Sequence, residues 1–318
     1  MPFTLRSVLN PSIEIVSIGA ILAVCSELWF YQVNSDTLSV WLFFVYGVFG
    51  YIFLWAIRHF QVRGFAGFFV GAALFGFLIE GIVVNVLYEA LPFSILWTSL
   101  AWHALLSVSV GYYFYRRVMG AGTLWQAILL NGSIGLFLGL WNGYIWNVVD
   151  GPDGGVVEFI WGDPTDFVLQ FLLGYIVFLF GHIGFDWLAA GQDRGNKPAY
   201  ILSALLLLAL FALGPLIGIF PFSLLLPVLI ALSLIALKAG TKAAPNIWLT
   251  QFENLRINKS RYLVSLFIPL GAAFGYFGLF WSGINFEANV VVILICGPIS
   301  VLLWGISLYR LFQQKHST

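Results

Sequence analysis

The sequence predicts an all-α fold: a polytopic transmembrane helix bundle of about ten spans, with the N-terminus and the C-terminus both inside the cell. The first observation is composition, because 61% of the 318 residues are hydrophobic and 9% are charged, whereas soluble domains carry about 25% charged residues. The second is that the apolar residues form runs close to the roughly 20 residues that a helix needs to cross a bilayer core. The third is that every lysine and arginine falls on one side of the resulting alternation.

Ten apolar runs divide the chain, which we treat as a single integral-membrane domain over residues 1–318. We expect the spans at approximately residues 13–33, 38–57, 64–88, 94–115, 124–147, 166–189, 199–219, 222–238, 262–281 and 288–312. The first run is predicted to be a retained helix, because no small-x-small cleavage site follows it. The seventh and eighth runs flank Phe220-Pro221-Phe222. Prolines in this region leave two arrangements open, either two short spans or a broken, re-entrant pair.

The basic residues test this count independently. With the N-terminus placed inside, all of them fall in inner connections or chain ends: Arg6, Arg58, Arg63, Arg116, Arg117, Arg194, Lys197, Lys238, Lys242, Arg256, Lys259, Arg261, Arg310 and Lys315. The outer connections carry acidic residues instead, at Asp36, Glu89, Asp150, Asp153, Glu158, Asp163, Asp166 and Glu287. Inner loops of membrane proteins are enriched in lysine and arginine. We therefore expect an integral protein of the plasma membrane with both termini in the cytoplasm.

Glu80 and His103 are the polar residues that point most clearly to a functional site. Each lies nine or ten residues from the outer end of its span, which predicts a depth of about 15 Å, near the midplane. The two spans are joined by the short connection Leu91-Pro92-Phe93, and helices joined so closely are usually neighbours. Because an ionisable group alone in hydrocarbon is costly, we expect the two side chains to meet in one interior cavity. A carboxyl beside an imidazole suits proton relay or general acid–base catalysis, and the alternative interpretation is a hydrogen bond that only fixes helix packing.

Further polar residues continue from this pair towards the outer face. Glu27 and Asn142 each lie about six residues from the outer end of a span, and Asn85, Glu89 and Asp150 lie further out. We expect these five residues to bind substrate along a polar path from the outer surface to the midplane, with Glu27 or Asn142 lining the space around the central pair.

A second polar pair, His182 and Asp186, lies four residues apart on one face near the inner end of the sixth span. An aspartate at a helix end with a neighbouring histidine can reach water or headgroups. We therefore expect this pair to be solvated rather than to form a second site.

Glycines and loops complete the organisation. Four glycines close to one face of the fifth span, from Gly132 to Gly143, predict contact with another helix rather than with lipid.

The outer connection 149–165 is turn-rich and acidic, which indicates a solvated connector or, alternatively, a lip that attracts cations. The inner connection 239–261 carries Trp248, Leu249, Phe252 and Leu255 at helical spacing. This spacing predicts a short amphipathic helix in the membrane interface.

Several function classes are excluded by what the sequence lacks. A net charge of zero argues against nucleic acid as a partner. Cys25 and Cys296 are isolated, so they indicate neither a disulfide framework nor a metal site. The sequence has no Walker A motif, which argues against an ATP-driven P-loop motor, and no His-Glu-x-x-His motif, which argues against a zinc protease. A Gly-x-Ser-x-Gly motif is also absent. We expect no cofactor, and we expect membrane lipids and a small-molecule or lipid-like ligand as partners.

Three functions stay open. The leading hypothesis is a secondary transporter of a small or amphipathic solute, in which Glu80 and His103 form the coupling pair. The second is an intramembrane enzyme that acts on a lipid or isoprenoid by general acid–base chemistry. The third is a non-catalytic assembly or scaffold subunit. The position of any cavity distinguishes them: a polar path to the midplane favours transport, and a cavity that opens sideways to lipid at the pair favours the enzyme.

Overall fold

The computed structural model describes residues 5–32, 40–62, 64–150, 157–188, 197–240 and 255–316. Within these residues, ten helical stretches are long and apolar enough to cross a membrane, which confirms the predicted number. The protein is therefore a multi-pass helical membrane protein. The outer acidic run at 151–156 and most of the predicted inner amphipathic helix, 241–254, lie outside the described residues.

The elements follow one another along the chain as α-helices (α), π- or 3₁₀-helices (η) and two short strands (β). In order they are α1 (Leu5–Ala23), η1 (Val24–Leu28), α2 (Val40–His59), α3 (Phe65–Ile79), η2 (Glu80–Val84), η3 (Val86–Tyr88), η4 (Ile95–Phe114), α4 (Tyr115–Ala121), α5 (Leu124–Ile145), β1 (Val148–Asp150), β2 (Val157–Phe159), α6 (Pro164–Leu188), α7 (Lys197–Leu213), α8 (Pro215–Gly218), η5 (Phe222–Leu224), α9 (Leu225–Ala239), η7 (Lys259–Leu266), α11 (Phe267–Ser282) and α12 (Ala288–His316).

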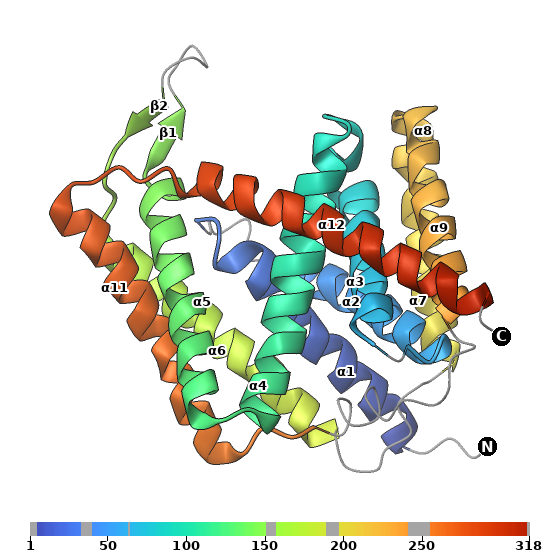
Figure 1. Ribbon diagram of the computed structural model, residues 1–318, viewed down its shortest axis with the longest axis horizontal. Coiled ribbons are helices and arrows are strands. Elements are labelled where there is room, and N and C mark those ends of the chain that lie inside the picture. The colour runs from blue at the N-terminus through green and yellow to red at the C-terminus, as the bar shows by residue number, and fades with distance from the viewer. Residues whose placement is uncertain are drawn as a thin grey trace.

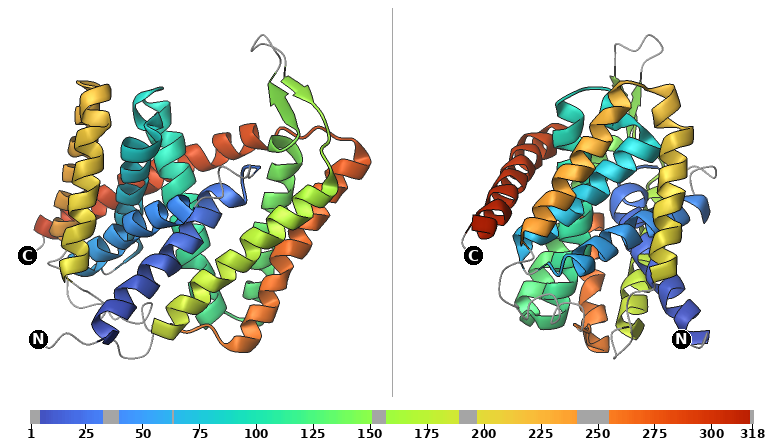
Figure 2. Two further views of the ribbon diagram at one scale, coloured as in Figure 1. Left: turned by 180° about the vertical axis from the view of Figure 1, so that it is seen from behind. Right: turned by 90° about the vertical axis from the view of Figure 1, so that its right-hand side faces the viewer.

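Two groups of helices stand on either side of a central pair (Figure 1). One group holds α5, α6 and α11, and the other holds α7, α8 and α9. Between them α3 packs against η4, and α12 crosses diagonally over both, with contacts to α5 and α9 at the two sides. Seen from behind, α1 lies between the two groups and packs on α2 and α6 (Figure 2). The central pair is thus covered on both faces.

Burial follows this arrangement. Of the span Phe65–Val84, which contains α3, 89% is buried inside the bundle, against 17% of the span Lys197–Gly218. The outer span can be almost purely aliphatic because its side chains face the membrane. A polar side chain on the α3 span has no route to water along its own helix, so its hydrogen bonds must come from neighbouring helices.

The seventh and eighth apolar runs form two separate helices. The stretches Lys197–Gly218 and Phe222–Ala239 are each long enough to cross the bilayer, and they run in opposite directions from a turn at the end of α8 (Figure 1). Of the two arrangements that the prolines leave open, the structure has the pair of spans.

The predicted glycine contact is present for three of the four glycines in the fifth span. α5 packs against α11 so closely that a Cβ atom at Gly135 or Gly139 would lie 2.1 or 2.2 Å from a backbone carbonyl oxygen of α11. A Cβ at Gly143 would meet the Leu279 side chain at 2.7 Å, whereas one at Gly132 would meet nothing within 4 Å. The close approach of the two helix backbones therefore explains the glycines at positions 135 and 139, whereas there is open space beside Gly132.

A short antiparallel hairpin, which the sequence did not predict, joins α5 to α6. Val148 pairs with Phe159, and Asp150 pairs with Val157. Asn147 ties the hairpin to the helix before it: its Nδ2 donates to the Gly143 carbonyl at 3.2 Å, and its Oδ1 accepts from the Gly162 amide at 2.8 Å. Strands of three residues are too short to produce an alternating pattern that a sequence reading would detect.

At the opposite end of the bundle, Asp186 differs from its prediction. Instead of being left to solvent, its carboxylate accepts from Arg116 Nη2 at 2.8 Å and from the Tyr262 hydroxyl at 2.5 Å. The same guanidinium donates to the carbonyl oxygens of His182 and Leu255. The buried guanidinium therefore needs this aspartate as its counter-ion, and together they tie α4, α6 and the segment before η7 to one another.

Candidate functional site

Three π-helical segments meet at the predicted midplane site. η1 carries Ser26 and Glu27, η2 begins at Glu80, and η4 carries His103 and Ser107. η1 packs on η4, and η4 packs on α3, which η2 continues. π-helical turns are rare and occur frequently at functional sites. Here they set the polar residues of three different spans against one another.

The predicted contact between Glu80 and His103 is present. The Nε2 atom of His103 lies 2.7 Å from Oε1 of Glu80, and the two residues are 1% and 4% exposed. Gly76, one turn before Glu80, makes this possible: a Cβ there would lie 2.2 Å from the Ser99 carbonyl oxygen and 3.2 Å from the His103 Cβ. The absence of a side chain at Gly76 lets α3 and η4 approach at the level of the pair.

Hydrogen bonds continue from the other side of the imidazole ring. Nδ1 of His103 lies 3.2 Å from the Ser26 hydroxyl, which lies 2.9 Å from the Ser107 hydroxyl. Ser107 also lies 2.9 Å from the carbonyl oxygen of Cys25. Since Ser26 has a single hydroxyl hydrogen, it can point in two directions. When Ser26 donates to Ser107, Nδ1 donates to Ser26, and Nε2 either donates to an ionised Glu80 from an imidazolium or accepts from a protonated Glu80. When Ser26 donates to Nδ1, the ring is neutral and Nε2 donates to Glu80.

The second carboxylate oxygen of Glu80 has no hydrogen-bond partner among the described residues, although it is fully buried. Buried carboxylate oxygens are normally satisfied by a donor or carry a proton. The free oxygen therefore marks the position in the pair where a proton, a water molecule or a polar group of a ligand would be stabilised.

Glu27 lies beside the pair, as predicted. The Tyr46 hydroxyl donates to its Oε1 at 2.5 Å, and the Tyr46 ring centroid lies 6.3 Å from that of His103. Tyr31 follows η1 at the outer end of the span, and its side chain is 47% exposed. Desolvation, together with the negative charges of Glu27 and Glu80, raises the pKa of Tyr31 to about 12. A phenol that stays protonated at neutral pH can donate hydrogen bonds between this carboxylate cluster and the outer surface.

No hydrogen bond among the described residues links Asn85, Glu89 or Asn142 to the Glu80–His103 pair. Asn142 is completely buried in α5, and neither of its side-chain amide atoms has a hydrogen-bond partner within the described parts of the chain. No hydrogen bond of the described residues connects Asn142 with Glu80. Asp150 lies in β1, beyond the end of α5.

Asn85 and Glu89 lie where the α3 span ends. Asn85 has left-handed backbone angles, with φ of 65°, and it separates η2 from the 3₁₀ turn η3. Its Oδ1 is buried without a partner in the described structure. Glu89 follows η3 and is exposed. Asn85 therefore marks a break in the helix five residues above Glu80, and Glu89 lies at the outer surface.

Sequence reasoning missed the residues that complete the cluster, namely Ser26, Tyr46, Trp102 and Ser107. The indole Nε1 of Trp102 donates to the Ser26 carbonyl at 3.0 Å, which satisfies a backbone group that the π-helical turn leaves free. Serine, tyrosine and tryptophan are common in membrane helices, so no composition signal distinguishes these residues. A search for small hydroxyl residues one helical turn from an intramembrane histidine would have found Ser107.

The described residues contain no group of three or more His, Cys, Asp or Glu side chains that could hold a metal ion. A cavity of about 720 Å³ lies between α2, α3, α7 and α9. Neither Glu80 nor His103 lines this cavity. It is therefore not the cavity that the sequence predicts around the Glu80–His103 pair.

Comparisons with protein-family models, with curated proteins and with solved structures found no match. The arrangement of the residues themselves therefore carries the functional argument.

Proposed function

We propose that this protein is a secondary transporter that couples the movement of a small or amphipathic solute to the movement of protons. The observation that carries the proposal is the buried contact between Glu80 and His103, which continues into the Ser26–Ser107 hydroxyl chain and lies near a second carboxylate, Glu27. Ionisable residues in membrane spans are expensive and mark ion or substrate pathways.

The break above Glu80 supports the same proposal. Transporters commonly hold their substrates and coupling ions at discontinuous helices near the midplane. In this chain, α3 passes into the π-helical η2 at Glu80 and ends at the left-handed Asn85. Irregular backbone of this kind is tolerated at membrane depth where it is buried in protein or lines a pathway.

Proton exchange follows from the pair itself. With a proton on His103 and none on Glu80, the contact is an ion pair that stabilises the packing of α3 against η4. When the solute neutralises Glu80, the imidazolium loses its counter-ion and gives up one proton, which leaves on the Glu80 side because the Ser26–Ser107 hydroxyls end on backbone carbonyl oxygens. Coupling requires two states that differ in their affinity for the solute and for the proton.

The two other hypotheses receive less support. A lipid-modifying enzyme requires the acid–base pair to face the space that holds the lipid, and the sideways cavity is lined by Leu74, Leu78 and Ile82 of the α3 span instead. A scaffold has no use for a buried carboxylate oxygen without a partner, because an apolar contact would stabilise the same packing at lower cost.

We place the protein in the plasma membrane with both termini in the cytoplasm. This orientation rests on the positive charges, since all lysines and arginines fall at the inner ends of the spans. Glu27 and Tyr31 then lie between the Glu80–His103 pair and the outer side, so protons would enter the site from outside.

Solid-supported membrane electrophysiology on reconstituted protein tests the proposal. Proteoliposomes would be exposed to a panel of solute classes, including amino acids, organic acids, organic amines and amphipathic cations, in the presence of an inward proton gradient. The wild-type protein is expected to give a pH-dependent transport current with at least one class. Glu80→Gln is expected to give none, while Glu287→Gln, which changes an exposed carboxylate at the outer surface, retains it. Equal currents from wild type and Glu80→Gln would contradict the proposed role of the pair.

A further inference from the structure

We infer that the cavity between α7 and α9 is a binding site for one anionic membrane lipid, with the lipid chain along the cavity and the phosphate at the inner end. This site is separate from the proposed transport pair and does not depend on it. Its volume of about 720 Å³ falls within the range of roughly 300–1,000 Å³ that is usual for small-molecule sites.

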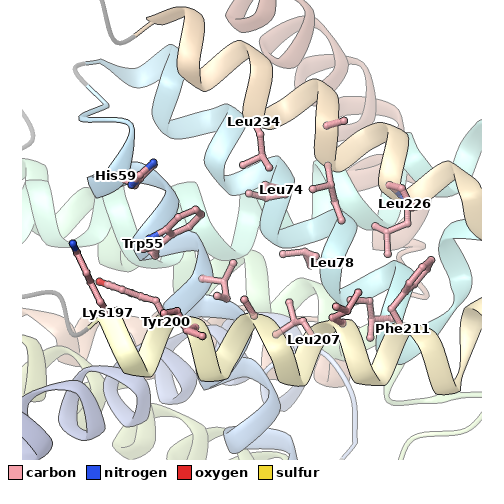
Figure 3. Close-up of a pocket in the computed structure, with 18 residues that line it drawn as sticks. Trp55, His59, Leu74, Leu78, Lys197, Tyr200, Leu207, Phe211, Leu226 and Leu234 are labelled. Carbon is pink, nitrogen blue, oxygen red and sulfur yellow. The ribbon is translucent and has the colours of Figure 1, made fainter.

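The cavity is apolar along its length and opens to the outside of the bundle. It lies between α7 on one side and α9 on the other, with α3 forming its floor (Figure 3). Two of the α7 side chains that line it, Ile201 and Leu208, are 60% and 62% exposed. In a membrane-spanning helix such an opening faces acyl chains, so a lipid can enter sideways without crossing a polar surface.

The length of the cavity suits a long chain. Its lining on α7 extends from Lys197 to Phe211, which corresponds to about 21 Å of helix. One leaflet accounts for about 15 Å, half of a hydrocarbon core of roughly 30 Å. A chain anchored at the Lys197 end would therefore reach past the midplane.

Charge is confined to one end. Figure 3 shows the nitrogen atoms of His59 and Lys197 at the end opposite Phe211 and Leu226. Among the described residues nothing pairs with the ammonium group of Lys197, and His59 stacks on Trp55 at 4.9 Å between ring centroids. Lysine recognises phosphate as a point charge, so this end fits an anionic headgroup.

Arg58, which precedes His59 in the sequence, is not available to bind the headgroup. Arg58 is held in a buried ion pair with Glu14, and it donates to the Tyr200 hydroxyl at 3.0 Å. Its charge is therefore compensated within the protein. Among the described residues that line the cavity, Lys197 carries a positive charge without a partner, at the end of the bundle that we assign to the cytoplasmic leaflet.

Native mass spectrometry of the delipidated full-length protein, titrated with defined lipids, tests the inference. The probe is palmitoyl-oleoyl phosphatidylglycerol, and the comparison lipid is palmitoyl-oleoyl phosphatidylcholine, which has the same chains and no net charge. We expect one phosphatidylglycerol molecule to bind more tightly than the others, with a preference over phosphatidylcholine. Equal affinity for the two lipids would overturn the assignment of the charged end.

Two pairs of variants locate the site. Ala204 lines the cavity and Ala209 is an exposed alanine of the same helix that does not. Ala204→Phe is expected to weaken the tight phosphatidylglycerol site by about tenfold or more, whereas Ala209→Phe leaves it unchanged. Ala231→Phe, from the α9 wall, fills the same space and repeats the test if the first variant fails to fold.

The second pair of variants reverses a charge: Lys197→Glu is the test and Lys259→Glu is its control. Both reverse an exposed lysine at the inner end of the bundle, and only the first lines the cavity. Lys197→Glu is expected to abolish the preference for phosphatidylglycerol, because a carboxylate repels the phosphate, and Lys259→Glu to preserve it. Wild-type binding in both Ala204→Phe and Ala231→Phe, or equal effects of the two lysine variants, would overturn the inference.

Discussion

The imidazole of His103 connects Glu80 on η2 with Ser26 on η1, through Nε2 at 2.7 Å and Nδ1 at 3.2 Å. The ring thus joins the first, third and fourth spans, and each of its nitrogens has one partner. The protonation of the ring sets the direction of the Ser26 hydroxyl, which donates to Nδ1 when that nitrogen carries no proton and donates to Ser107 when it does.

Replacing Ser26 by alanine is expected to destabilise the protein by about 1 kcal/mol, because Nδ1 of His103 and the Ser107 hydroxyl then lose their shared partner. Reversible unfolding in mixed micelles measures the difference from wild type. Ser233→Ala is the matched control. Ser233 is equally buried, but its hydroxyl bonds only the Leu229 carbonyl of its own helix. Equal stability changes for the two variants would show that Ser26 has no special role at the imidazole.

The helix contact between α5 and α11 yields a second prediction. Gly139→Ala would bring a methyl group to 2.2 Å from the Ala272 carbonyl oxygen, so the two helices must move apart. We expect a loss of about 1–3 kcal/mol in unfolding free energy, the range typical of overpacking. Gly132→Ala has open space at the same helix and should be neutral or stabilising by up to about 1 kcal/mol. Reversible unfolding in mixed micelles compares the stabilities of the two variants. A Gly139→Ala protein as stable as the Gly132→Ala protein would refute the close contact between α5 and α11.

Much of this fold could be predicted because the physics of the bilayer is simple. Span number follows from run length, and the Glu80–His103 contact follows from helical rise and the short turn at Pro92. What could not be predicted is lateral packing. Depth along a span does not say which helix faces which, and Asn142 is fully buried with no hydrogen bond to the pair among the described residues.

The π-helical segments are the second feature that sequence periodicity could not reveal. A π-helical turn rotates every following side chain relative to an α-helix, so faces assigned with a period of 3.6 residues are shifted beyond it. η4 is π-helical from Ile95 to Phe114. The face shared by His103 and Ser107 therefore depended on the structure, and Ser26 was overlooked because its neighbours became visible only there.

The orientation of the chain is open to direct labelling. In a background without Cys25 and Cys296, Asp163→Cys at the exposed start of α6 and Lys259→Cys at the start of η7 lie at opposite ends of the bundle. A membrane-impermeant maleimide added to intact cells is expected to modify only the cysteine at position 163. The cysteine at position 259 should react after permeabilisation. The reverse pattern would invert the topology and place the carboxylate cluster on the cytoplasmic side.

The central claim is that Glu80 exchanges a proton with its surroundings while it is bound to His103. pH-dependent infrared difference spectroscopy of the protein in lipid observes this directly through the carboxylic acid band. We predict a buried carboxylic acid band that changes with pH in the wild type and in Glu89→Gln, is missing from Glu80→Gln, and changes at a different pH in His103→Gln. A Glu80→Gln spectrum identical to that of the wild type over the whole pH range would contradict the claim.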